Sequence, residues 1–277
     1  FLNNIGSLKN TGFELVLGGT PVKTDNFSWN ATAIFNRNRN EAFDIGALRL
    51  LSTNPGAPVA IIDGQPLGVF YGTYFARKAD GSYLTNTAGI PQTAKGTQTS
   101  VIKPTETLDA NGLPTGAVLR KVIGNPNPDY TASIVNELSY KKWNFRAQLD
   151  AVQGVDVFNA DFRTRQGVGN GTVAEAEQRG LIPRGYISGV YAIEEWRVDD
   201  GSFIKLRELS LSYNVGKVKF INNLSINFSG RNLISWDNYK GYDPEVNSGG
   251  QSTLLRGIDF GATPIPRTFS FGIKADF

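Results

Sequence analysis

Acidic residues that lie close together are the first candidates for chemistry in this sequence. Glu194-Glu195 and Asp199-Asp200 bring four carboxylates together in one short stretch. Two carboxylates are enough to hydrolyse a glycosidic bond. Their presence is the whole argument for that reaction, so we expect them to bind partners, ions or sugars rather than to catalyse.

Two stretches resemble fragments of cation sites. They are Asp109-Ala-Asn-Gly112 and Asp199-Asp200-Gly201. A twelve-residue calcium loop also needs further oxygen ligands, notably a bidentate Glu at its last position, and neither stretch supplies one. Asp, Asn and Gly stabilise tight turns. The sequence therefore predicts ordinary turns here and no metal site.

Composition removes most other catalytic designs. The chain has no Cys and no His, so it lacks thiolate ligands, disulfides, the usual proton shuttle and the commonest metal ligand. Basic residues exceed acidic ones by only 28 − 25 = 3 and are scattered, which gives no concentrated field for nucleic acid. We predict a protein that is not an enzyme, needs no cofactor and binds no nucleic acid.

The strongest pattern is alternation of apolar and polar residues over about ten residues, the length at which a tilted strand crosses a bilayer. Trp143, Phe145, Ala147, Leu149 and Ala151 alternate with polar residues, and so do Phe269, Phe271, Ile273, Ala275 and Phe277. Similar alternation covers residues 13–17, 27–35, 130–134, 208–215 and 224–229. No run of about 18 apolar residues exists, which excludes a transmembrane helix.

Short and long connections alternate between these segments. The short ones are Thr20–Asn26, Lys141–Lys142 and Gly216–Asn222, and the long ones are Asn36–Pro66, Gly154–Ser202 and Leu233–Pro266. Compact soluble domains rarely contain such long loops, whereas outer-membrane barrels combine short periplasmic turns with long extracellular loops. The sequence therefore predicts an all-β fold, an antiparallel transmembrane β-barrel segment, with its C-terminus periplasmic.

One region breaks this count of strands. If Leu67–Phe75 and Ala117–Ile123 were both wall strands, the long link between them would be periplasmic. We expect an additional strand, within residues 55–63 or 77–103, to restore the order.

The polar faces of the predicted strands supply candidates for contact with cargo in the lumen. They are Arg146, Gln148, Asp150, Glu208, Asn227, Arg231 and Lys274. Generic lining of the lumen, with ion pairs to a plug, is the alternative for each of them. At the strand ends, Tyr140, Trp143, Trp236, Tyr239 and Tyr242 fit an interfacial aromatic girdle. Stacking on sugars is the alternative for Trp236, Tyr239 and Tyr242, which begin a long loop.

Four blocks resemble the SusC/RagA family of TonB-dependent outer-membrane transporters, in the family's order. The first two blocks are Asn4-Ile-Gly-Ser-Leu-Lys-Asn-Thr-Gly-Phe-Glu-Leu15 and Ile123-Gly-Asn-Pro-Asn-Pro-Asp-Tyr130. The other two are Arg197-Val-Asp-Asp-Gly-Ser-Phe-Ile-Lys-Leu-Arg-Glu-Leu-Ser-Leu-Ser-Tyr213 and Ser229-Gly-Arg-Asn-Leu-Ile-Ser-Trp236, which leads to Gly241-Tyr-Asp-Pro-Glu-Val246. The first block is followed near the end of the chain by Pro266-Arg-Thr. The match covers essentially the whole chain but only the C-terminal part of such a transporter.

The resemblance implies that residues 1–277 supply about the last eight to ten strands of a large plugged barrel in a Bacteroidetes-like outer membrane. It implies import of oligosaccharides or peptides with a SusD-like surface lipoprotein as lid. Energy would come from a TonB complex through N-terminal regions, which are absent here together with the plug. An aromatic last residue, Phe277, resembles the signal read by the barrel assembly machinery, so we expect a true terminus there and not at Phe1.

Two rival interpretations remain. A soluble all-β carbohydrate-binding or adhesin module would bury the apolar faces of the strands in a two-sheet core. A barrel enzyme of the protease or lipase kind would need a Ser-Lys or carboxylate arrangement, because the chain has no His.

Overall fold

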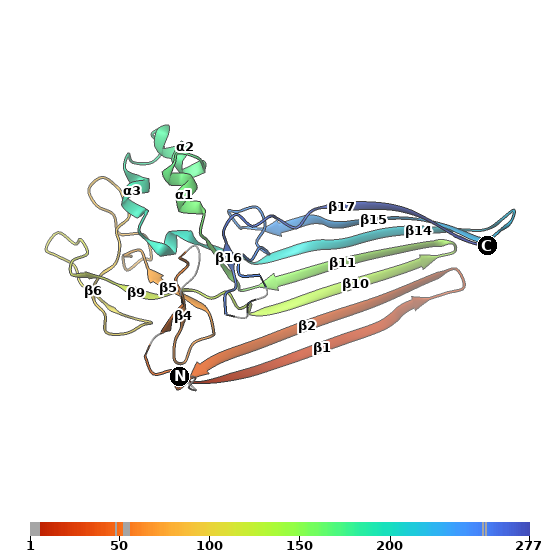
Figure 1. The fold of residues 1–277 in the computed structure, drawn as a ribbon, viewed down its shortest axis with the longest axis horizontal. Helices are drawn as coiled ribbons and strands as arrows, with labels where there is room; N and C mark the ends of the chain where they lie inside the picture. The colour runs from red at the N-terminus through yellow and green to blue at the C-terminus, as the bar shows by residue number, and fades with distance from the viewer. Residues whose placement is uncertain (1–5, 48, 52–55, 251, 253) are drawn as a thin grey trace.

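The structure of the protein is a computed structural model that describes residues 6–277 except 48, 52–55, 251 and 253. Asn4 and Ile5 of the first sequence block lie outside the described residues. A long antiparallel sheet occupies one end of the molecule, and small sheets and helices form a head at the other (Figure 1). We define the head as residues 44–129, 154–202 and 238–267.

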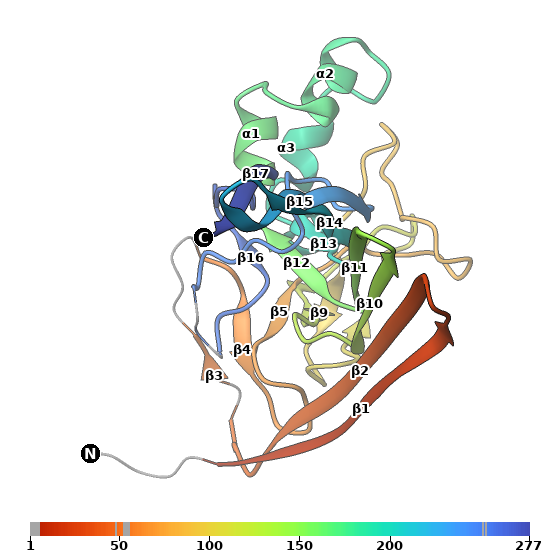
Figure 2. The ribbon, with the colours of Figure 1, turned by 90° about the vertical axis from the view of Figure 1, so that its right-hand side faces the viewer.

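The long sheet contains seven strands in the order β1-β2-β10-β11-β14-β15-β17. Their bounds are β1 Ser7–Lys23, β2 Phe27–Phe43, β10 Tyr130–Tyr140, β11 Trp143–Gln153, β14 Phe203–Val218, β15 Ile221–Asp237 and β17 Thr268–Asp276. Every neighbouring pair is antiparallel. Seen along the strands, the sheet curves as an arc from β1 to β17 (Figure 2).

The head is built from short elements. Its strands are β3 Arg49–Leu50, β4 Val59–Ile61, β5 Val69–Thr73, β6 Lys95–Thr97, β7 Thr105–Glu106, β8 Ala117–Val118, β9 Arg120–Gly124, β12 Asp156–Asn159, β13 Val198–Asp200 and β16 Ile258–Asp259. Its helices are α1 Phe162–Gly167, α2 Thr172–Gln178, α3 Tyr186–Val190 and the 3-10 helix η1 Glu194–Arg197. No helix among the described residues is both long and apolar enough to span a membrane.

The strand order differs from the sequence prediction between residues 44 and 129. β5 and β9 pair with each other in a small sheet of the head and do not join the long sheet. β2 therefore pairs directly with β10, and every long link lies at the same end of the long sheet. Strands do occur within residues 55–63 and 77–103, namely β4 and β6, but both belong to small sheets of the head. The expectation that one of them would restore the order of wall strands was therefore wrong. Leu67–Phe75 is apolar on both faces because it is buried in the head. The long sheet accordingly has seven strands rather than eight to ten.

The two faces of the long sheet differ in polarity. Register places Phe35, Ile134, Leu149, Leu211, Phe228 and Phe271 on the same face. Phe269, Phe271 and Ile273 remain 63%, 69% and 63% exposed. One polar side chain on this face, Asn136, accepts a hydrogen bond from the Trp29 indole at 3.0 Å. The polar group of Asn136 is thus hydrogen-bonded within the apolar face. The apolar side chains of this face remain exposed.

The buried core lies in the head rather than on the long sheet. Phe70, Phe158 and Ile258 form a fully buried cluster that joins β5, β12 and β16. The Phe70 and Phe158 ring centroids are 5.7 Å apart. Side chains from three different long links therefore pack together, which fixes the head as one unit.

Candidate functional site

The polar face of the long sheet brings four of the predicted residues together. Strand register sets Gln148 opposite Glu208, and Glu208 opposite Arg231. Asp150 lies two residues along β11 from Gln148 and accepts a hydrogen bond from its side-chain amide at 2.9 Å. With Arg207, Asn232, Glu245 and Ile265 they line a hollow of about 490 Å³. We call this hollow the wall site.

A network of ion pairs holds the wall site. Arg207 donates to Asp150 at 2.8 Å and to Glu245 at 3.0 Å. Lys205 pairs with Asp243 at 2.6 Å and with Glu245 at 2.9 Å. Asp243 and Glu245 belong to the link between β15 and β17, which lies on the concave side of the arc (Figure 2). The polar face is therefore the concave one, and the network fastens this link to it.

Local backbone irregularities create this arrangement. The β11–β14 register shifts between Gln148 and Leu149, which leaves Arg207 as an extra residue on β14. On β15, Asn232 takes a left-handed conformation with φ 53°. The side-chain oxygen of Asn232 accepts from Arg207 at 2.9 Å, and its side-chain nitrogen donates to the Pro266 carbonyl at 3.2 Å. The bulge turns Arg207 toward the residues it must bind.

Burial makes the Lys205–Asp243 pair the centre of the network. Their side chains are 5% and 7% exposed. Burial alone would raise the pKa of Asp243, but hydrogen bonds from Lys205 and from the backbone N–H groups of Glu245 and Ile265 outweigh it and hold this pKa below its usual value. Asp243 is therefore ionised at neutral pH, and both of its carboxylate oxygens accept hydrogen bonds.

Sequence reasoning missed Lys205, Arg207, Asp243 and Glu245. The signal was present: the adjacent charged residues Arg207 and Glu208 break the alternation that β14 otherwise keeps. Two of the recognised blocks, residues 197–213 and 241–246, meet through these ion pairs. The resemblance had identified both blocks without indicating that they touch.

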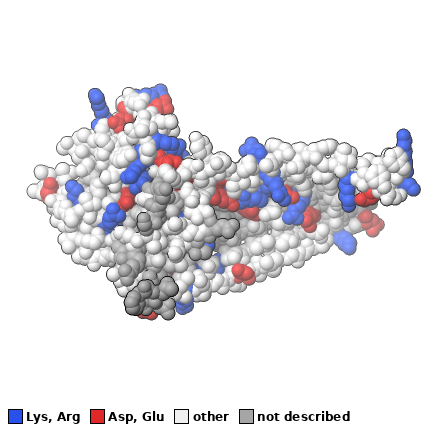
Figure 3. Space-filling view, in the orientation of Figure 1, with Lys and Arg blue, Asp and Glu red and all other residues white. Residues whose placement is uncertain are grey.

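A second row of charges continues from the wall site along the sheet. Arg146 pairs with Glu137 and, at 3.6 Å, with Glu208. Glu208 also pairs with Arg231 at 3.3 Å. Figure 3 shows basic and acidic side chains interspersed along the sheet. The alternating signs leave little net field, so this row suits neutral or weakly charged molecules better than strongly charged ones.

Two predicted residues lie away from this cluster. Asn227 stands opposite Gly272, where an added Cβ would come within 2.5 Å of its side-chain oxygen. Lys274 lies farther along β17 and is 73% exposed, with Asp276 at 3.9 Å. Both remain on the polar face but outside the wall site.

The three aromatic candidates at the long-loop end have different environments. Trp236 is 51% exposed and Tyr242 is 83% exposed. Tyr239 is 8% exposed, and its hydroxyl donates to Asp259 at 2.6 Å. Burial, followed by that hydrogen bond, raises the pKa of Tyr239. Tyr239 therefore packs the loop, and contact with cargo does not fit its burial.

Aromatic residues also gather at the short-turn end. The Trp143 and Tyr213 ring centroids are 4.5 Å apart. Phe277 is 78% exposed and stacks on Phe220, with ring centroids 6.1 Å apart. Tyr140 is half exposed at the same turn as Trp143. The interfacial girdle and the terminal signal at Phe277 stay predictions.

The acidic pairs that suggested catalysis or ion binding serve the head's own structure. Glu194 accepts from the Thr73 N–H at 2.9 Å and Glu195 from the Phe75 N–H at 2.7 Å. Arg120 and Arg77 pair with them at 3.1 Å and 2.8 Å. Asp199 pairs with Lys240 at 2.5 Å.

Asp200 and Asp109 accept hydrogen bonds from backbone N–H groups close to them in the sequence. Asp200 accepts from the backbone N–H of Ser202. Asp109 accepts from the N–H groups of Asn111 and Leu113. The turn prediction is thus confirmed for Asp109-Ala-Asn-Gly112. It was wrong for the other stretch, because Asp199 and Asp200 belong to strand β13.

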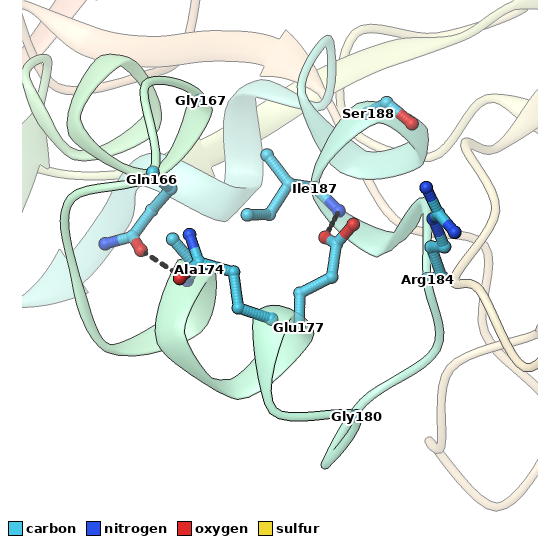
Figure 4. Close-up of a pocket in the computed structure, with 10 residues that line it drawn as sticks. Gln166, Gly167, Ala174, Glu177, Gly180, Arg184, Ile187 and Ser188 are labelled. Atoms are coloured by element: carbon cyan, nitrogen blue, oxygen red, sulfur yellow. Dashed lines mark hydrogen bonds between the residues drawn. The ribbon is translucent and has the colours of Figure 1, made fainter.

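A hollow of about 720 Å³ lies among α1, α2 and α3 (Figure 4). Gln166 accepts from the Ala174 N–H at 3.0 Å, and Glu177 accepts from the Gly185 and Ile187 N–H groups. These side chains hold the helices in place. The side-chain oxygens of Gln166 and Glu177 are thus used inside the head.

Comparison with known proteins finds relatives of the whole chain. No family model matches the chain. TonB-dependent receptors P26 and P3 of Formosa agariphila are each 28% identical over 100% of this chain. TonB-dependent receptor SusC of Bacteroides thetaiotaomicron is 25% identical over 99% of it. The chain is similar over its whole length to part of these TonB-dependent receptors.

The chain spans less than a third of these receptors, covering 30%, 29% and 27% of their lengths. Its fold also matches a chain of the RagAB peptide importer in the closed-closed state, with TM-score 0.74 and 22% identity over 99% of this chain and 30% of that one. The SusC/RagA resemblance and the all-β antiparallel barrel-segment fold are therefore confirmed.

Proposed function

We propose that residues 1–277 form the C-terminal part of an outer-membrane β-barrel domain whose complete protein imports nutrients. The observation that carries the proposal is the uncovered apolar face, which continues across seven antiparallel strands from Phe13 to Phe271. Soluble proteins rarely leave so large a patch in water, whereas lipid is the natural neighbour of such a face. The concave polar face would line the lumen.

The wall site has a specific place in this proposal. Its ion pairs hold the β15–β17 link against the inner face of the barrel wall. The link would therefore narrow the lumen of the barrel. Arg146, Gln148, Asp150, Glu208 and Arg231 would then border the path of oligosaccharide or peptide cargo. Asn227 and Lys274 would line the wall nearer the periplasm.

The binding partners that we propose are inferred from the relatives, since the structure contains this chain alone. A SusD-like surface lipoprotein would close over the head, and a TonB complex would act through regions outside these 277 residues. Lipid would cover the apolar face, and the assembly machinery would read Phe277. Of the rival functions, the soluble two-sheet module predicts a cover over the apolar strands, and none of the described residues provides one.

Fractionation tests the proposal directly. We expect the native protein in the outer membrane, extracted by detergent, with heat-modifiable migration and a co-purifying lipoprotein. Recovery as a stable monomer in the aqueous fraction, with no detergent, would contradict it.

A further inference from the structure

A second hollow, of about 290 Å³, lies at the base of the head beside the wall site. It is lined by Asn159, Asp161, Arg165, Tyr242, Asp259 and residues 261–264. We call it the Tyr242 pocket. Residues 261–264 continue into Ile265, which lines the wall site, so one segment borders both hollows.

The Tyr242 pocket contains buried donors without partners. Asn159 is fully buried, and its side-chain oxygen accepts from the Phe162 N–H at 3.1 Å. Its amide nitrogen, and the Nε of Arg165, have no hydrogen-bond partner among the described residues. Buried polar groups are nearly always paired. Two residues that line one hollow thus each carry an unpaired buried donor, which points to a ligand with acceptor oxygens.

Acceptors line the same pocket. Asp259 is 8% exposed and receives the Tyr239 hydroxyl on one carboxylate oxygen. The other oxygen is available for a second donor. The Asp161 carboxylate lies 3.2 Å from where a Cβ on Gly261 would stand. A ligand here must donate as well as accept.

Charge and shape restrict the ligand further. Two carboxylates disfavour an anion, and Arg165 beside them disfavours a bare cation, which would also need six or more oxygen ligands. Tyr242 adds an aromatic ring that is 83% exposed, a large apolar surface with low conformational cost. The volume is at the small end of ligand pockets. We propose that the Tyr242 pocket binds one ring of a neutral sugar.

Sugar chemistry fits each wall of the pocket. Each hydroxyl both donates and accepts, so neighbouring hydroxyls satisfy Asn159 and Arg165 while donating to Asp161 and Asp259. The C–H face of the ring packs on Tyr242. The inference rests on the proposed function in one respect, that the bound sugar is cargo on its way to the wall site.

Binding by the complete receptor, purified in detergent, tests the inference. The probes are maltohexaose, laminarihexaose, xylohexaose, cellohexaose and mannohexaose, with a pool of neutral tetrapeptides as comparison, and calorimetry gives the Kd. We expect at least one oligosaccharide to bind. Tyr242→Ala and Asp161→Asn should each weaken it about tenfold or more, and Tyr242→Phe should retain affinity.

Tyr83→Ala is the matched control, because Tyr83 is an aromatic residue of the head that is 41% exposed and does not line the Tyr242 pocket. It should leave the Kd unchanged. Failure of every oligosaccharide to bind, sugar binding indifferent to Tyr242→Ala and Asp161→Asn, or peptide binding that depends on these residues would each overturn the sugar assignment. Heat-modifiable migration in the outer membrane would persist in all three cases, which separates this failure from failure of the proposed function.

Discussion

Single residues in this chain matter most where a charge is buried. Lys205 is 5% exposed at its side chain and faces two carboxylates. Removing one partner of a buried pair leaves the other charge uncompensated, and this costs more than the pair itself contributes. Lys205 therefore controls whether the β15–β17 link stays on the wall.

Lys205→Met should lower the free energy of opening the 241–246 segment by about 3 kcal/mol. Hydrogen exchange at the Glu245 and Ile265 amides measures this, since both amides donate to Asp243. Lys274→Met is the control: its pair is long and exposed, so exchange should change little. Unaltered exchange in Lys205→Met would show that the link is held by other contacts.

Asp243 gives the same link a pH dependence. Because the folded pKa of Asp243 is lowered, its stabilisation is fully present above the ordinary value of 3.8 and is lost as pH falls through the folded pKa. Exchange at Glu245 and Ile265, corrected for intrinsic rates, should be constant from pH 5 to 8 and accelerate below about pH 3.8. Asp243→Asn should remove the pH step, and a step that survives this substitution would assign it to another group.

At the scale of elements, the head is assembled by carboxylates that satisfy backbone groups of other segments. η1 presents Glu194 and Glu195 to the N–H groups of Thr73 and Phe75. These contacts join the second long link to the first. Glu194 and Glu195, which had suggested catalysis, thus hold the 154–202 link against the 44–129 link.

Glu195→Ala should therefore open the contact between η1 and the segment after β5. The Phe75 N–H and the Arg77 guanidinium both lose a partner, and we expect a loss of about 1–3 kcal/mol. Faster hydrogen exchange across residues 73–77 and 193–197 would report it. Glu175→Ala breaks an exposed pair with Arg179 on α2 and should alter exchange hardly at all. Equal effects of the two substitutions would contradict the docking role.

The alternation of residue types was enough to predict the long strands, because a half-polar strand has period two whatever its partners are. β10 and β11 appear where Tyr130 to Ala151 alternate. The head was not predictable in this way. β5 is apolar on both faces because it is buried, and its pairing with β9 depends on contacts far along the chain.

The wall site was predicted in part for a related reason. Gln148, Asp150, Glu208 and Arg231 follow from strand parity. Arg207 depends on a bulge, and Asp243 and Glu245 depend on how a loop folds back, so no periodic pattern could place them. Tyr239 illustrates the opposite error, because an aromatic residue at a strand end can equally be buried beneath the loop.

For the whole molecule, the two faces of the long sheet should respond oppositely to charge. Phe271 and Ser270 are neighbours on β17 that point to opposite faces, and Phe271 pairs with Phe228 in mid-strand. Phe271→Arg would place a charge toward lipid at a cost of about 2–4 kcal/mol near the bilayer centre. Ser270→Arg places the same charge at the same depth toward water. The amount of heat-modifiable receptor in the outer membrane should therefore fall for Phe271→Arg and hold for Ser270→Arg. The reverse result would mean that the polar face is the outer one, and equal tolerance of both would show that neither face meets lipid.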